Sequence, residues 1–244
     1  KAMVKTMTMT KAMVKTMTKA MVALAMKYAV FGEDAQNADL AATLKNLANV
    51  KKDRGDLDGA QEQYEQVLAM KYAVYGEGAQ NASLAGTLNN LANVKKDRGD
   101  LDGAQEQYEQ VLAMKYAVYG EGAQNASLAG TLNNLANVKK DRGDLDGAQE
   151  QYEQVLAMKY AVYGEGAQNA DLAVLLHNIA LVKKDRGDFK EAEAGFRHAL
   201  AMFEASVGPD HQGIVIARGG LAHAIMLQND DRSHEGGASV EEGL

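Results

Sequence analysis

The chain contains no cysteine, and it has fewer basic residues than acidic ones. Without cysteine it can form neither disulfides nor thiolate metal sites, which fits a reducing compartment, and we expect a cytoplasmic location. No run of 18 apolar residues occurs, so we expect no membrane span. A net charge of −7 argues against a nucleic-acid partner. With 46% hydrophobic and 24% charged residues, the composition is that of an ordinary soluble protein.

An internal repeat dominates the 244 residues. Residues 57–100 and 101–144 are the same 44-residue string, and residues 145–188 repeat it with six substitutions. The substituted positions are Asp171, Val174, Leu175, His177, Ile179 and Leu181. Such a period is typical of arrays in which each unit buries its apolar face against its neighbours. We therefore expect one array over residues 20–228. A leader rich in Met, Lys and Thr (residues 1–19) precedes it, and an acidic, glycine-containing tail (residues 229–244) follows and is expected to fray.

Each repeat predicts a first helix, called helix A, over residues 83–98 in the second copy. Its apolar residues have the spacing of one buried stripe: Leu84, Leu88, Leu91 and Ala92. Ser83 is expected to cap this helix, and Gly99 to end it in a left-handed conformation. The copies of helix A are expected to start near residues 39, 83, 127, 171 and 212.

A second helix, called helix B, is predicted from the cap Asp100 to about Tyr119, a length of about 28 Å. Its expected apolar stripe is Leu101, Ala104, Tyr108, Val111, Leu112 and Tyr119. No alternation with a period of two residues occurs, which argues against strands. The predicted fold is all-α, an α-solenoid of stacked antiparallel helix pairs, with an inner wall of A helices and an outer wall of B helices.

The repeat resembles the tetratricopeptide repeat family. The residues that carry the resemblance are Leu88, Leu91, Ala92, Gly99, Ala104 and Tyr108, then Leu132, Leu135, Ala136, Ala148 and Tyr152, and in the best copy Ile179, Ala180, Gly187, Phe189, Ala192, Phe196 and Ala199. The strings TLNNLANV and GPDH are similar to the longer-repeat kinesin-light-chain class. The resemblance implies a right-handed superhelix whose helix A residues line a concave peptide-binding groove.

The chain also departs from the family pattern. Lysines replace the aromatic residue late in helix A: Lys51, Lys95, Lys139 and Lys183. The usual closing proline is absent except for Pro209 at a different place, and each unit is about ten residues longer than the standard one. We therefore do not expect the curvature or groove width of the family to apply unchanged.

An asparagine ladder is the candidate binding surface on helix A. Its residues are Asn89, Asn90 and Asn93, repeated as Asn133, Asn134 and Asn137, with Lys45, Asn46 and Asn49 in the first copy and His177 and Asn178 in the fourth. An amide offers both donors and an acceptor, so the ladder can pair with the backbone of an extended peptide. The alternative is a polar, solvated helix face.

A partial carboxylate clamp, as in the co-chaperone relatives, is implied by Lys45, Asn49 and Asn90. Gly130 and Asn134 occupy the places of its basic pair, so only weak anchoring of a terminal carboxylate is expected. The KKDR string that ends each helix A favours a solvated helix terminus whose cations complement the dipole. It could also attract acidic peptides.

The leader has three interpretations. Residues 1–18 contain KAMVKTMT twice, with methionines four residues apart and five lysines up to Lys19. The segment can be a basic amphipathic helix for a membrane surface, an import receptor or a partner groove. It can also be a helix B that covers the edge of the first helix A. A third interpretation is an engineered or wrongly assigned leader, and since the chain starts at Lys1 we expect that it was processed, trimmed or engineered.

No active site is evident. His177 lacks a nucleophile or carboxylate partner, the other histidines lack the spacing of metal ligands, and glycine-rich phosphate loops are missing. We expect no enzyme activity, cofactor or metal. The main hypothesis is an interaction scaffold that binds an extended peptide, by resemblance one with an aromatic residue among acids. The alternative is a structural module that associates with itself through its ends or its Met-rich helix.

Overall fold

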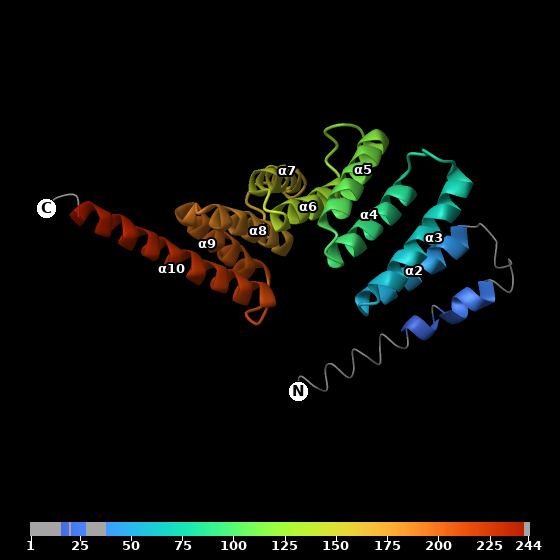
Figure 1. Cartoon of the computed structure of the whole chain (residues 1–244), viewed down its shortest axis with the longest axis horizontal. Helices are drawn as coiled ribbons and strands as arrows, with labels where there is room; N and C mark the ends of the chain where they lie inside the picture. The colour runs from blue at the N-terminus through green and yellow to red at the C-terminus, as the bar shows by residue number, and fades with distance from the viewer. Residues whose placement is uncertain (1–15, 20, 28–37, 242–244) are drawn as a thin grey trace. The chain divides into compact units, whose positions relative to one another are not determined.

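A computed structural model describes residues 16–19, 21–27 and 38–241 of the chain, with side chains up to residue 231. Within these ranges every regular element is a helix, and the helices follow one another in pairs (Figure 1). The pairs are α2 (Ala38–Asp53) with α3 (Leu57–Tyr75), α4 (Ala82–Asp97) with α5 (Leu101–Tyr119), α6 (Ala126–Asp141) with α7 (Leu145–Tyr163), and α8 (Ala170–Arg186) with α9 (Phe189–Ser206). The last helix is α10 (Gln212–Glu241).

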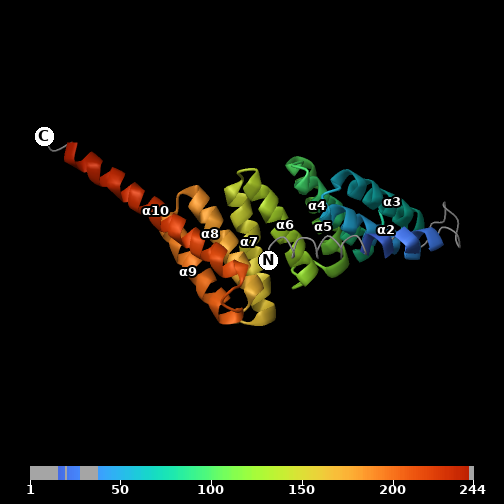
Figure 2. The same ribbon diagram turned by 90° about the horizontal axis from the view of Figure 1, so that it is seen from below.

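The chain forms two compact units, residues 1–123 and 124–244. In the first unit α3 packs against α4, so the second pair stacks on the first. In the second unit α7 packs against α8, and α10 packs against both α9 and α8 (Figure 2). The two helices of a pair are joined by a turn of two or three residues, which makes them antiparallel. Within each unit, the predicted all-α class of stacked helix pairs is confirmed.

The helix ends show why these sequences form helices. The backbone N–H of Gly103 donates to Asp100 Oδ1 at 2.9 Å, which confirms Asp100 as the N-cap of α5. Gly99 has φ of 84°, the left-handed conformation expected of it. The predicted cap Ser83 is wrong. Helix α4 begins one residue earlier, because Asn81 Oδ1 accepts from the backbone N–H of Leu84 at 2.8 Å.

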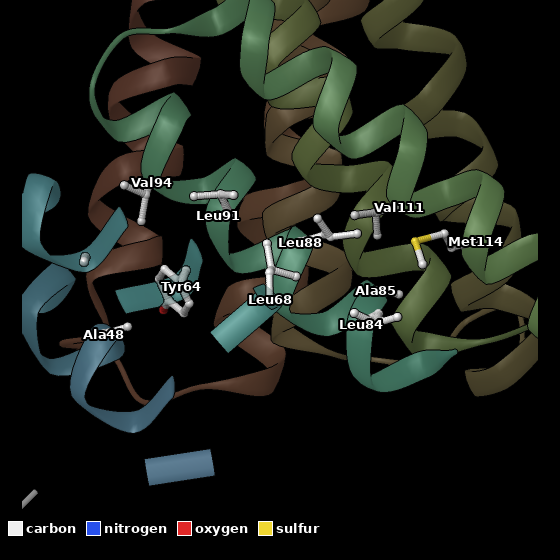
Figure 3. Close-up of a cluster of buried hydrophobic side chains, with 11 residues drawn as sticks. Ala48, Tyr64, Leu68, Leu84, Ala85, Leu88, Leu91, Val94, Val111 and Met114 are labelled. Atoms are coloured by element: carbon white, nitrogen blue, oxygen red, sulfur yellow. The ribbon is translucent and has the colours of Figure 1, made fainter. Parts of the chain in front are cut away.

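The core of the first unit is continuous through four helices. Figure 3 shows Tyr64 and Leu68 of α3 among side chains of α2, α4 and α5. The predicted stripe on helix A is confirmed, since its four residues in α4 are at most 5% exposed. Tyr119 was expected in the core of helix B but is 37% exposed. Helix α5 has 19 residues against 16 in α4, so its last turn extends past its partner.

At the N-terminus, residues 21–27 pack on α2 as a helix B does. Residues 16–19 and 21–27 are helical, Leu24 packs on the core beside α2, and Lys27 Nζ donates to the backbone oxygen of Asp39 at 2.8 Å. These contacts belong to the predicted array, and the three interpretations of the leader stay predictions. The methionine stripe over residues 1–15 lies outside the described residues. At the other end, α10 continues to Glu241, past the predicted end of the array.

Candidate functional site

A buried tyrosine and an asparagine of the ladder are joined in each of the first three repeats. The Tyr108 hydroxyl, on a residue with no exposed surface, donates to Asn93 Oδ1 at 2.6 Å. Tyr152 bonds Asn137 in the same way at 2.5 Å, and Tyr64 bonds Asn49. Burial raises the pKa of all three tyrosines, and the charge of a nearby aspartate on helix A adds to the effect. They therefore stay protonated and continue to donate.

The fourth repeat lacks both members of this hydrogen bond. Leu181 stands at the asparagine position and Phe196 at the tyrosine position, and the two pack in one apolar cluster. A buried hydroxyl without an acceptor is costly, whereas replacing both partners with apolar groups is nearly neutral. The paired change therefore indicates that this asparagine position has a structural role. Where the pair exists, the tyrosine also holds the amide in one orientation.

The first unit has a pocket that is lined by Lys45 of the candidate binding surface and by none of its asparagines. Asn46 is exposed, whereas Asn89 and Asn90 are half-buried. The pocket is lined by Ala41, Ala42 and Lys45 of α2, by Met70, Lys71, Val74 and Tyr75 of α3, and by Ser83. It therefore combines an apolar wall with two lysines, which suits a ligand that carries an apolar group next to an acid.

Lys71 was missed by sequence reasoning. Its Nζ donates to the backbone oxygen of Ser83 at 2.6 Å and to Thr87 Oγ1 at 2.7 Å, so it ties α3 to the start of α4. Burial lowers the pKa of Lys71 to about 8, and the nearby Lys45 charge contributes. A usable signal existed, since a lysine recurs every 44 residues in the apolar stretch of helix B, at residues 27, 71, 115 and 159, and only α9 has Phe203 there instead.

In the second unit, the ladder residues Asn133 and Asn134 of α6 are half-buried, as is Asn178 of α8. His177 is only 8% exposed and packs against the Phe196 ring, with 5.1 Å between ring centroids. Burial lowers the pKa of His177, and the charges of Lys140 and Lys184 lower it further. It is therefore a neutral packing residue with little surface for a ligand.

The arginine of the KKDR string links neighbouring pairs. Arg98 contacts Asp58 Oδ1 at 3.0 Å and Gln61 Oε1 at 2.5 Å, both on the preceding helix B. Arg186 repeats this with Asp146 at 3.0 Å and Gln149 at 2.8 Å. Lys96 and Lys140 are half-buried, and each forms an ion pair with the aspartate that follows it, at 3.6 Å and 3.4 Å. The string thus contributes to stacking.

The clamp residues are placed on two helices of the first unit. Lys45 and Asn49 lie on α2 and Asn90 lies on α4. Asn49 accepts a hydrogen bond from Tyr64, and Lys45 is the one of these three residues that lines the pocket. In the part of the chain that the structure describes, no helix is long and apolar enough to cross a membrane.

Comparison with known proteins identifies the repeat. The family model described as tetratricopeptide repeat matches residues 39–117, 83–161 and 171–233, which is more than half of the chain. Solved structures with the same fold include BtubC (BKLC) from P. vanneervenii, with TM-score 0.72 and 21% identity over 96% of this chain and 93% of that one. A putative kinesin light chain from Podosopora anserina, described as having nearly identical TPR-like repeats, has TM-score 0.65 and 21% identity over 80% of this chain and 89% of its own. No curated protein matches the chain significantly.

Proposed function

Since this chain belongs to the tetratricopeptide repeat family, whose fold generally mediates protein–protein interaction, we propose that it is a noncatalytic scaffold that binds an extended peptide along its A helices. The amide side chains of Asn46 and Asn90 supply sequence-independent contacts to the peptide backbone. The absence of cysteine fits action in the cytoplasm.

The pocket of the first unit is the single observation that carries this proposal. Lys45 and Lys71 lie at a wall made by Met70 and Val74, and Val74 is 52% exposed. An apolar side chain of the peptide packs on this wall while a neighbouring carboxylate pairs with Lys45. The ligand class is therefore a peptide with an aromatic or aliphatic residue among acids. Lys71 already donates to Ser83 and Thr87, so Lys45 is the main charge partner.

Fluorescence polarisation with labelled peptides tests the proposal. The probes are one peptide with a tryptophan between acidic residues, the same peptide with the tryptophan changed to alanine, and one with the acids changed to amides. We expect Lys45→Ala to weaken the first probe about tenfold, the effect of one charge-assisted contact of about 1.5 kcal/mol. Lys52→Ala, which removes a half-buried lysine of the same helix that does not line the pocket, is the matched control.

The ladder is tested separately from the pocket. Asn46→Ala and Asn90→Ala together should weaken all three probes by a similar factor, about tenfold, because they contact the backbone. Asn93 and Asn137 are unsuitable for this test, since alanine there would leave a buried tyrosine hydroxyl without its acceptor. Unchanged affinities in both the Lys45 and the Asn46/Asn90 variants would disprove peptide binding on this face.

A further inference from the structure

The helix α10 occupies the place of a helix A, but one face that is covered in the other A helices is open. Ile214, Ala217 and Ala224 are buried, as are the equivalent residues of α8. Val215 and Ala222 stand where α8 has Ala173 and Ala180, which have no exposed surface. Val215 is 58% exposed and Ala222 is also exposed. Farther along this face Met226 is 53% exposed.

The covering element in α8 is its own helix B. Ala173 packs with Met202 and Phe203 of α9, and Ala180 packs with Phe196. The first repeat has the same contact, since Ala41 of α2 packs with Val67 and Met70 of α3. The open face of α10 therefore matches one half of an interface that recurs within the chain, and in the other repeats the second half of that interface is a helix B.

Residues 21–27 present the other half. Met26 stands 44 residues before Met70, and Ala23 stands 44 residues before Val67. Met70 and Met114 are 8% and 9% exposed because each packs on the helix A of its own repeat, whereas Met26 is 65% exposed. On their other side residues 21–27 already contact α2 through Leu24. This helix therefore contacts the helix A that follows it, and within the described residues no helix A covers Met26 on its other side.

We propose that α10 of one copy binds residues 21–27 of a second copy, as a helix A binds the helix B of its own repeat. Met26 of the second copy then packs on Val215, in the way that Met70 packs on Ala41 and Met202 on Ala173. Arg218 takes the place of the apolar Leu176 on this face, but its charge is paired with Glu204 of α9 at 2.7 Å. The new contact continues the interface that already exists within the chain.

The contact is heterologous, because it joins two different surfaces. Each copy retains one open α10 and one open N-terminal helix after a first association, so copies add head to tail until a ring closes or a filament grows. Peptide binding on the A helices and this self-association use different surfaces. Failure of one therefore says nothing against the other.

The mass of the full chain in solution, measured over a concentration series, tests the proposal. We expect masses that rise above the 26.1 kDa of one copy as concentration increases. Met26→Glu or Val215→Glu should each return the chain to 26.1 kDa, and because both side chains are more than half exposed, helicity should be unchanged. Met21→Glu is the matched control. It is 53% exposed, and the repeats carry an exposed glutamate at its position, so association should persist.

Mixing the two defective variants distinguishes the head-to-tail contact from any symmetric one. Met26→Glu leaves α10 intact, and Val215→Glu leaves residues 21–27 intact. An equal mixture should therefore form a complex of two copies and no larger species. A chain that stays at 26.1 kDa at every concentration would overturn the proposal, and so would a mixture of the two variants that remains monomeric.

Discussion

The hydrogen bond between Tyr108 and Asn93 predicts a strong coupling between two substitutions. Tyr108→Phe removes a donor, and Asn93→Leu removes its acceptor, while the double variant reproduces the pair that the fourth repeat already contains at Phe196 and Leu181. The two side chains lie on α4 and α5 of the same repeat, with 2.6 Å between oxygens. The change can therefore be made without altering the helices.

The magnitudes follow from burial. Tyr108 has no exposed surface, so Asn93→Leu leaves its hydroxyl without an acceptor, and we expect a loss of about 1–3 kcal/mol in the free energy of unfolding. Asn93 is half-buried and can turn to water, so Tyr108→Phe should cost only about 1 kcal/mol. The double variant loses donor and acceptor together and should lie within about 0.5 kcal/mol of the parent chain. The coupling free energy, which is the sum of the two single losses minus the loss in the double variant, is then about 2–4 kcal/mol.

Urea unfolding followed by circular dichroism gives the four free energies, provided that all four chains unfold in transitions of equal slope. The reciprocal exchange is the control. Phe196→Tyr alone buries a hydroxyl and should destabilise, and adding Leu181→Asn should recover most of the loss. Single substitutions whose costs simply add, in either repeat, would refute the idea that the asparagine serves the tyrosine.

Three further predictions concern the caps, the buried phenols and the arginine links. Gly103→Ala should lower the free energy of unfolding by about 1 kcal/mol, because the added Cβ would lie 2.3 Å from the Asp100 carboxylate that caps α5. Gly86→Ala should raise it by about 0.5–1 kcal/mol, because the added Cβ would meet no atom within 4 Å. Thermal unfolding compares the two variants. Equal effects of the two substitutions would contradict the cap. Burial, helped by the Asp53 charge, raises the pKa of Tyr64 from 10.0 to about 12. In that window the unfolded chain ionises while the folded chain does not, so the free energy of unfolding should fall as pH rises from 10.0 to 12, and less so in Tyr64→Phe. A pH dependence identical in both chains would count against this. Arg98→Ala should cost no more than about 1 kcal/mol in urea unfolding, because Asp58 is exposed, and a loss above 2 kcal/mol would mean that the link is stronger than a surface ion pair.

Much of the fold could be predicted because it depends on short-range features of the sequence. The stripe from Leu84 to Ala92 and the cap at Asp100 each depend on residues within a few positions of one another, and the 44-residue period repeats them along the chain. All three features are present in the structure. The pairing of Asn137 with Tyr152 could also have been inferred, since both positions change together in the next repeat, to Leu181 and Phe196. The cap at Asn81 was missed because Ser83 is an equally good capping residue by type.

The candidate site was only partly predictable. Periodicity placed the asparagines on helix A, but it did not reveal that Asn49, Asn93 and Asn137 hold tyrosine hydroxyls, which changes what they offer to a ligand. Nor did it reveal the pocket, because Lys45 and Lys71 belong to different helices and approach only when α2 and α3 pack.

The sequence by itself determined the helices, the cap at Asp100, the pairing of the helices and the family, since hydrogen bonds along a helix and one buried stripe depend on neighbours within a turn or two. The tertiary structure alone decided the exposed last turn of α5 at Tyr119, the burial of His177 beside Phe196, and the open face of α10 at Val215. The physical reason is that the exposure of a side chain depends on the helix that packs against it and not on the residues beside it in the chain.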